Sequence, residues 1–321
     1  MFKNCTRLTS LEIPGSVNVI GNQTFEGCTG LTSVTFADGE GSLIIGFNPN
    51  TDERGPFYDS PLTEITLNRN LAMTEAYTKA ADDYDEGIFS YKNYSNHSTT
   101  LEIGIYVKEI LPYMFAGSGI TSVEIPANVS AVGYNAFLYC YNLKEVSIPE
   151  ASTPLTFGYQ YYKSADWGPF YDSPLEKVSF NRDINFVDKN GQTFTADDWD
   201  EGVFATKNGT LSSISIGTGV TKILPYMFAE SNATSVWIPH TIKTIGNNAF
   251  DNCDELRGVT LGFDGQLGFD RPSIGKDVFD DCGKFNYIKV RKSVHKRFIT
   301  DNSSDEWFEY QDWIKWDDNF E

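Results

Sequence analysis

Apolar residues recur along the chain in one short pattern. A Phe is followed three residues later by Cys, then by Leu, then by an alternating V-x-I segment that often ends in Pro, as in FLYCYNLKEVSIP at 137–149. The alternation predicts a short β-strand with one buried face. Pro cannot donate to a strand ladder, so the Pro that follows predicts the end of each strand.

The pattern repeats at two levels. Phe2 and Phe25 are 23 residues apart, and the segments GPFYDSPL at 55–62 and ILPYMFA at 110–116 both return 113 residues later. The chain therefore holds nearly three copies of a 113-residue superunit of about four coils each, or about eleven coils in all. The anchor phenylalanines are Phe2, Phe25, Phe57, Phe89, Phe115, Phe137, Phe170, Phe204, Phe228, Phe250 and Phe279.

A short period with fixed apolar positions predicts a repeat solenoid. One coil cannot bury its own apolar face, whereas stacked coils bury a continuous core. The V-x-I segments then form a parallel β-ladder with coils about 4.8 Å apart. We expect this solenoid over residues 1–290. The aromatic-rich segment 291–321 departs from the pattern and is expected to be a helical or irregular C-terminal cap of the same domain.

The repeat F-x-x-C-x-x-L-x-x-V-x-I-P-x-x-V-x-x-I-G resembles the BspA-like, bacterial surface-antigen class of leucine-rich repeat. Its L-x-x-V-x-I core is similar to the general leucine-rich L-x-x-L-x-L. The resemblance implies a leucine-rich-repeat solenoid that is secreted or on the cell surface, and that serves adhesion to a host or matrix protein. It also implies that the chain is not an enzyme.

Charge narrows the class of partner. Lys and Arg number 25 and Asp and Glu number 44, which gives a net charge of −19. Nucleic-acid binders carry a basic footprint, so we expect no nucleic-acid partner and favour a partner with basic patches. No apolar run approaches the ~20 residues of a membrane span, so we expect no integral membrane protein. The N-terminus shows no basic-then-apolar leader.

Catalytic and metal-binding chemistry is weakly supported. The three histidines, His97, His240 and His295, lie in unrelated contexts, and no nucleophile-elbow, P-loop or zinc motif occurs. Acidic clusters at 82–86 and 197–201 occupy equivalent positions in two copies, whereas a catalytic site is normally unique. We expect no enzyme, no cofactor and no metal, with a carboxylate-based glycoside-processing enzyme as a distant alternative.

The five cysteines each follow a Phe by three residues, which predicts buried packing thiols. A disulfide between Cys5 and Cys28, on adjacent coils, is left open.

Two groups of residues are candidates for binding. The middle residues of the V-x-I strands face outward and form a polar row that includes Glu102 and Glu124, and Trp237 interrupts this row. An outward Trp indicates either a binding hot spot or a residue covered by an insertion. A second group, Tyr159, Tyr161 and Trp167, lies in an insertion-bearing coil, where it stacks on sugar rings or packs the loop. A protein partner is the first hypothesis and a polysaccharide is the alternative.

Overall fold

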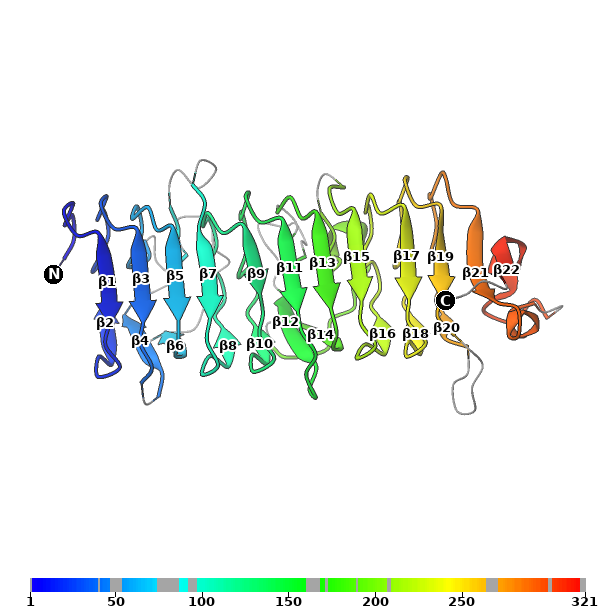
Figure 1. Ribbon diagram of the computed structural model, residues 1–321, viewed down its shortest axis with the longest axis horizontal. Helices are drawn as coiled ribbons and strands as arrows, with labels where there is room; N and C mark the ends of the chain where they lie inside the picture. The colour runs from blue at the N-terminus through cyan, green and yellow to red at the C-terminus, as the bar shows by residue number, and fades with distance from the viewer. Residues whose placement is uncertain are drawn as a thin grey trace. The chain divides into compact units, whose positions relative to one another are not determined.

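Short parallel β-strands joined by turns form most of the regular structure in the computed structural model (Figure 1). The structure describes residues 2–39, 41–46, 54–73, 87–91, 97–159, 168–170, 173–188, 190–206, 209–263, 271–299 and 302–317. The chain divides into two compact units. Unit 1 comprises Met1–Ile148, Leu155–Leu175 and Asn185–Phe194, and unit 2 comprises Pro149–Pro154, Glu176–Ile184 and Thr195–Glu321.

In unit 1 the V-x-I segments form the predicted parallel ladder. Leu11 pairs with Val34, and Val34 pairs with Ile65, so equivalent residues of successive coils are in register. The ladder strands are β1 (Ser10–Ile13), β3 (Ser33–Phe36), β5 (Glu64–Leu67) and β7 (Thr100–Ile103), followed by β9 (Ser122–Glu124) paired with β11 (Glu145–Ile148).

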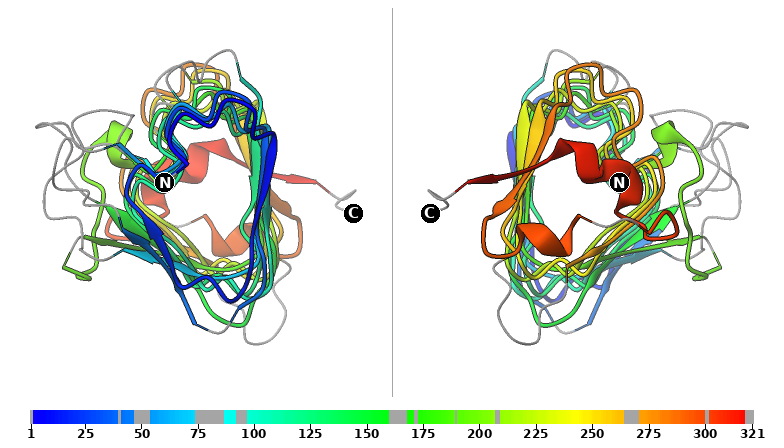
Figure 2. Two further views of the ribbon diagram at one scale, coloured as in Figure 1. Left: turned by 90° about the vertical axis from the view of Figure 1, so that its left-hand side faces the viewer. Right: turned by 90° about the vertical axis from the view of Figure 1, so that its right-hand side faces the viewer.

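A second row of strands lies on another side of each coil (Figure 2). In unit 1 it consists of β2 (Val19–Gly21), β4 (Leu43–Gly46), β6 (Leu71–Met73), β8 (Glu109–Ile110), β10 (Ala131–Val132) and β12 (Leu155–Tyr159), with β14 (Ile184–Asp188) next to β12.

Unit 2 repeats both rows. Its ladder strands are β13 (Lys177–Phe180) paired with β15 (Ser213–Ile216), and then β17 (Ser235–Ile238), β19 (Gly258–Leu261), β21 (Tyr287–Arg291) and β22 (Ile314–Asp317). The second row comprises β16 (Lys222–Ile223), β18 (Thr244–Ile245) and β20 (Ser273–Ile274). The helical elements are three short 3-10 turns, η3 (Trp199–Glu201), η4 (His295–Arg297) and η5 (Phe308–Trp313), within the described ranges.

The anchor phenylalanines stack on one another through the core of each unit. In unit 1 the ring centroids of Phe25 and Phe57 are 5.2 Å apart, and those of Phe115 and Phe137 are 5.5 Å apart. In unit 2 the Phe228 and Phe250 centroids are 5.3 Å apart. A ring at the same place in every coil lies on the ring of the previous coil, and aromatic pairs stabilise beyond their buried area. This stacking explains why the repeat is anchored by Phe.

In several coils the residue three positions after the anchor Phe donates a hydrogen bond to the coil before. The thiol of Cys140 donates to the carbonyl of Phe115 (3.2 Å) and that of Cys253 to the carbonyl of Phe228 (3.3 Å). In another coil the hydroxyl of Ser60 donates to the carbonyl of Phe25 (2.9 Å). All five cysteines are free; Cys28, Cys140 and Cys253 are buried, and Cys5 and Cys282 are half-buried. The prediction of packing thiols is confirmed for the three buried residues, and Cys5 and Cys28 are not bridged.

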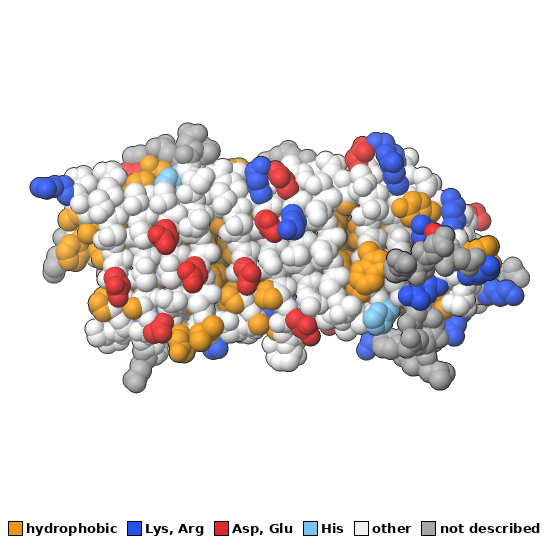
Figure 3. All heavy atoms as spheres, viewed as in Figure 1, with side chains coloured by type: hydrophobic (Ala, Val, Ile, Leu, Met, Phe, Trp, Pro, Cys, Tyr) orange, Lys and Arg blue, Asp and Glu red, His pale blue; other side chains and the backbone are white. Residues whose placement is uncertain are grey.

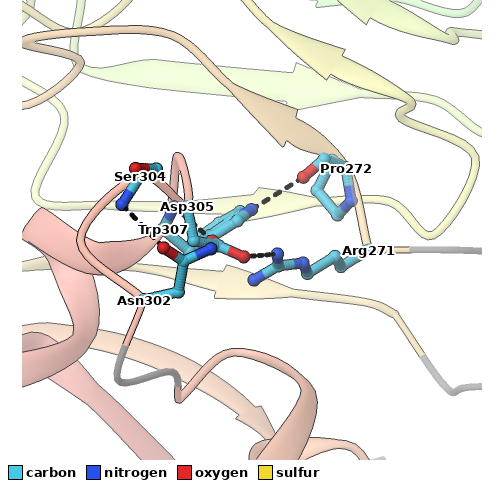
Figure 4. A network of polar contacts seen from close by, with 6 residues as sticks. All are labelled: Arg271, Pro272, Asn302, Ser304, Asp305 and Trp307. Carbon is cyan, nitrogen blue, oxygen red and sulfur yellow. Dashed lines mark hydrogen bonds and ion pairs between the residues drawn. The ribbon is translucent and has the colours of Figure 1, made fainter.

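The C-terminal segment covers the end of the last coils. Figure 2 shows η5 lying across that end of unit 2. Trp307 is fully buried, and its indole N–H donates to the carbonyl of Pro272 at 2.8 Å. Asp305 pairs with Arg271 and also accepts the backbone N–H of Trp307 at 2.9 Å (Figure 4). The hydroxyl of Tyr310 donates to the carbonyl of Gly275 at 2.9 Å.

The apolar residues Val294, Phe298 and Ile299 fall at helical spacing in the sequence, and the structure buries only two of them. Val294 and Phe298 are buried as expected, but Ile299 is 43% exposed. Residues 314–317 form β22, which pairs in parallel with β21; Ile314 is buried, whereas Lys315 and Trp316 are exposed. The boundary between a solenoid over 1–290 and a cap over 291–321 stays a prediction.

The ladder is interrupted at matching places in the two units. β7 and β9 belong to different sheets, and so do β15 and β17, although each pair is adjacent. The strand starts Thr100 and Ser122 are 22 residues apart, as are Ser213 and Ser235, whereas Ser10 and Ser33 in the paired strands β1 and β3 are 23 apart. The ladder interruption therefore accompanies the shorter coil of each superunit.

Candidate binding face

The outward side of β17, β19, β21 and β22 in unit 2 is the candidate binding face. Trp237 pairs with Thr260, Thr260 with Lys289, and Lys289 with Lys315, so these four side chains form one row across the strands. The flanking residues Val236 and Ile238 are buried, as strand alternation requires. The sequence predicted that Trp237 lies in an outward row, but it did not place Lys315 there, because β22 lies outside the repeat pattern.

Trp237 is accessible. Its side chain is 45% exposed, so the alternative that an insertion covers it is not what the structure shows. A Cβ added at Gly262 would lie 2.9 Å from Cζ2 of the indole, which means that the indole edge rests on a backbone without a side chain. A larger residue at Gly262 would push the ring away from the sheet.

Tyr287 rests on the same strand in the same way. A Cβ added at Gly258 would lie 2.6 Å from Cδ2 of the Tyr287 ring. Gly258, Thr260 and Gly262 occupy alternating positions along and just beyond β19, so this strand offers two glycines on which the neighbouring rings lie. The binding face therefore carries two aromatic rings with the short side chain of Thr260 between their supports. No pattern in the sequence indicates this support, because each ring and its glycine belong to different coils.

Two lysines extend the row beyond the rings. The ammonium of Lys289 lies 3.2 Å from the carboxylate of Asp317, and the ammonium of Lys315 donates to the carbonyl of Asn286 at 2.9 Å. An ammonium has three N–H donors, so each lysine retains donors beyond the contacts given for it in the described part of the chain. The face combines aromatic surface with cations that are available to a ligand.

In unit 1 the same outward row is acidic. Glu102 and Glu124 are exposed on the neighbouring strands β7 and β9, and Glu12 occupies the equivalent position on β1. Figure 3 shows acidic side chains spread over this ladder face. The structure thus places Glu102 and Glu124 together in unit 1, whereas Trp237 belongs to the face of unit 2.

The insertion aromatics do not form a described site. Tyr159 ends β12 and its side chain lies outside the described residues, as do Tyr161 and Trp167. Phe157, from the same sequence group, is fully buried and packs edge-on against Phe170 at 5.8 Å between centroids. The one described side chain of this group therefore packs the core.

The acidic cluster at 197–201 is part of a turn. Glu201 is buried, and its Oε2 accepts the backbone N–H groups of Asp197 (2.7 Å) and Asp198 (3.3 Å). The equivalent cluster at 82–86 lies outside the described residues. Across the described ranges, no group of three His, Cys, Asp or Glu side chains is arranged to hold a metal ion.

A pocket of about 450 Å³ lies beside the cap, lined among others by Lys276, Asp305 and Glu309. Asp305 already pairs with Arg271, and hydrogen bonding to that guanidinium lowers the pKa of Asp305 below its usual range. This pocket belongs to the packing of the cap. Among the helices of the described part of the chain, none is long and apolar enough to cross a membrane.

Parallel ladders of short strands, a stacked Phe core in each unit and a covering C-terminal segment define a repeat solenoid of the leucine-rich type. The chain belongs to the family described as the BspA type leucine rich repeat region, which matches in 6 copies over residues 1–80, 87–195 and 199–299.

Solved structures of bacterial leucine-rich proteins are similar at low identity. A leucine rich cell surface protein from Faecalibacterium prausnitzii is 20% identical, with 92% of this chain and 83% of that chain covered and a TM-score of 0.35. A leucine-rich repeat protein from Bacteroides ovatus is 15% identical, with 98% and 85% covered and a TM-score of 0.33. The pneumococcal vaccine antigen PcpA is 17% identical, with 88% and 68% covered and a TM-score of 0.32. No curated protein matches the chain.

Proposed function

We propose that this chain is a non-enzymatic binding protein, secreted or on the cell surface, whose outward ladder face presents a rigid surface to a protein partner such as a host or matrix protein. The observation that carries the proposal is the exposed Trp237, held in register on the strands of unit 2. Trp is enriched among the residues that dominate protein–protein binding energy. A surface built on paired strands is preformed, so little ordering entropy is lost on association.

A protein partner is favoured over a glycan by the position of the aromatic residues. Trp237 and Tyr287 lie on an open sheet face, beside Thr260 and Lys289. Phe157, the insertion aromatic whose side chain is described, is part of the core. A polysaccharide partner remains the second candidate, through Tyr159, Tyr161 and Trp167.

The proposal is tested by binding of the purified chain to arrays of extracellular-matrix proteins, serum proteins and glycans. The variant Trp237→Thr removes the indole but keeps a residue that Thr35, Thr66 and Thr260 show to fit this position of the ladder. The matched control is Tyr106→Ala, because Tyr106 is 54% exposed and belongs to unit 1, whereas the Trp237 row belongs to unit 2.

We expect saturable binding to a protein, weakened at least tenfold by Trp237→Thr and less than twofold by Tyr106→Ala. Loss of a hot-spot Trp costs about 2 kcal/mol or more, and 1.4 kcal/mol corresponds to a factor of ten. Binding to glycans alone, or protein binding that does not depend on Trp237, would overturn the proposal for this face.

The cellular location is tested separately, with antibodies raised against the chain. Labelling of intact cells, or recovery of the chain from the medium, is expected. Labelling that requires permeabilised cells would contradict a surface or secreted location.

A further inference from the structure

We infer that the partner of the unit 2 face is an acidic protein segment, in which an aromatic or apolar side chain packs on Trp237 and carboxylates bind Lys289 and Lys315. This inference rests on the proposed function and specifies the chemistry of the partner. The net charge of the whole chain predicts a partner with basic patches. For the unit 2 face we infer the opposite, an acidic partner.

The first support is the local sign of the charge. The segment 283–300 contains six Lys and Arg residues and no Asp or Glu, in a chain whose net charge is −19. The row Trp237, Thr260, Lys289 and Lys315 contains no carboxylate, whereas the same row in unit 1 carries Glu12, Glu102 and Glu124. Complementary charge sets partner choice and association rate, so each face selects partners of opposite sign.

The second support is the available hydrogen bonding. Lys289 is 41% exposed and Asp317 is the carboxylate beside it, at 3.2 Å. Exposed ion pairs of this kind contribute only about 0–1 kcal/mol, so a ligand carboxylate can share or replace Asp317 at small cost. Lys315 is exposed and bonds to a neutral backbone carbonyl. Both ammonium groups can therefore donate to a ligand.

The third support is the spacing along the row. Adjacent strands lie about 4.8 Å apart, which puts Lys289 about 10 Å and Lys315 about 14 Å from the Trp237 position. An extended chain advances about 3.3 Å per residue, so these separations correspond to roughly three and four residues. Because successive side chains of an extended chain point to opposite sides, acidic residues two and four positions from the aromatic residue share its side and can reach Lys289 and Lys315.

The inference is tested with polymers of defined chemistry immobilised on a biosensor at 0.15 M NaCl. The probes are a random Glu–Tyr copolymer, poly-L-glutamate and polygalacturonate, a polysaccharide that also carries carboxylates. The test variant is Lys289→Gln/Lys315→Gln. Its matched control is Lys243→Gln/Lys276→Gln, which changes the net charge equally at exposed lysines of unit 2 outside the row.

We expect the Glu–Tyr copolymer to bind most tightly. Lys289→Gln/Lys315→Gln should weaken that binding at least tenfold, and the control variant less than twofold. Trp237→Thr should weaken binding of the Glu–Tyr copolymer at least threefold and leave poly-L-glutamate unchanged. Unfolding midpoints of both double variants within a few degrees of the parent chain show that the loss arises at the face.

Three results would overturn the inference. Equal losses of affinity in both double variants would show that the net charge of the chain alone attracts the polymer. Tighter binding of polygalacturonate would identify an acidic glycan as the ligand. Absence of binding to all three polymers would show that the face does not bind an acidic ligand. Failure of the inference is separable from failure of the proposed function. A protein from the array that needs Trp237 but binds Lys289→Gln/Lys315→Gln normally would support the function and contradict the acidic partner.

Discussion

At the scale of single residues, the buried cysteines three positions after an anchor Phe have a structural role. They recur because they bond to the coil before, and they are not reactive thiols. The sulfur donates to the carbonyl of the preceding coil, as Cys140 does to Phe115, and Ser60 fills an equivalent position with a hydroxyl. Burial raises the pKa of the Cys140 thiol to about 12, so it stays protonated at neutral pH. In these coils a small side chain with one hydrogen to donate occupies the position.

Cys140→Ser should therefore be tolerated better than Cys140→Ala. Serine keeps a donor to the Phe115 carbonyl, whereas alanine removes this hydrogen bond, at a cost of about 0.5–1.5 kcal/mol, while the carbonyl still accepts the backbone N–H of Ser118. Urea unfolding of the two variants measures the difference. An alanine variant as stable as the serine variant would contradict a donor role.

Asp251 gives a pH dependence of stability. Desolvation, with the neighbouring carboxylates Asp280 and Asp281, raises its pKa to about 6, and hydrogen bonds from Asn248 and Asn252 offset part of this. Because the folded protein holds this proton more tightly than the unfolded chain, stability falls as the pH rises from about 4 to about 6.

Asp251→Asn should remove that loss. We expect the variant to be about 1 kcal/mol more stable at pH 7.5, after discounting for solvent screening of a partly exposed group, and unchanged at pH 4. Thermal unfolding at the two pH values measures this. The exposed Asp254→Asn is the control, and equal stabilisation by both variants would point to net charge instead of the Asp251 site.

At the scale of elements, the C-terminal segment ends the solenoid by burying one large residue against the last coil. Trp307 is fully enclosed, packs edge-on against Phe298 at 4.9 Å between centroids, and bonds to the Pro272 carbonyl. Trp316 in β22 is 48% exposed and lies under the ammonium of Lys292 at 4.5 Å. Two tryptophans of one segment thus have different roles.

Trp307→Phe should cost about 1–3 kcal/mol, because it opens a cavity and leaves the Pro272 carbonyl without its donor. Trp316→Phe should change stability by less than about 0.5 kcal/mol, as expected for an exposed position. Chemical unfolding that shows equal effects of the two substitutions would contradict the covering role of Trp307.

The helical spacing of residues 294–299 predicts two of the three buried side chains correctly. The third prediction fails because the helical element is only one 3-10 turn long. Val294 and Phe298 pack inward from a single 3-10 turn, but the turn ends before Ile299 reaches the core. The strand β22 spans only four residues, too few for periodicity alone to identify.

At the scale of the whole molecule, the excess of Asp and Glu over Lys and Arg makes electrostatic repulsion the dominant effect of charge on stability. A net charge of −19 opposes the compact state, whereas an exposed ion pair such as Lys284–Glu255 contributes little. Repulsion should therefore dominate the response to salt.

We expect the unfolding temperature to rise by several degrees between 0.02 and 0.5 M NaCl, because salt screens the repulsion. Sucrose of equal osmolality serves as the control for solvent exclusion. A lower unfolding temperature in NaCl would show that attractive pairs outweigh the repulsion.

The repeat pattern was sufficient to predict the solenoid, its parallel register and the outward row, because each depends on residues within one period. It did not predict the support of the Trp237 ring by Gly262 or the position of Lys315, which depend on contacts between a coil and its neighbours. For the same reason the net charge of −19 did not predict the cationic row in unit 2.

The ladder interruptions beside β7 and β15 have a mechanical consequence for a protein that holds a partner while being pulled. Tension along a stacked array is carried by the backbone hydrogen bonds between neighbouring coils, and coils interact mainly with their neighbours. At these two junctions the second row still joins the coils, through β8 with β10 and β16 with β18, whereas the first row is broken except for the bridge between Thr99 and Ile120. Fewer strand pairs join the coils there, so we expect extension by force to begin at these two junctions.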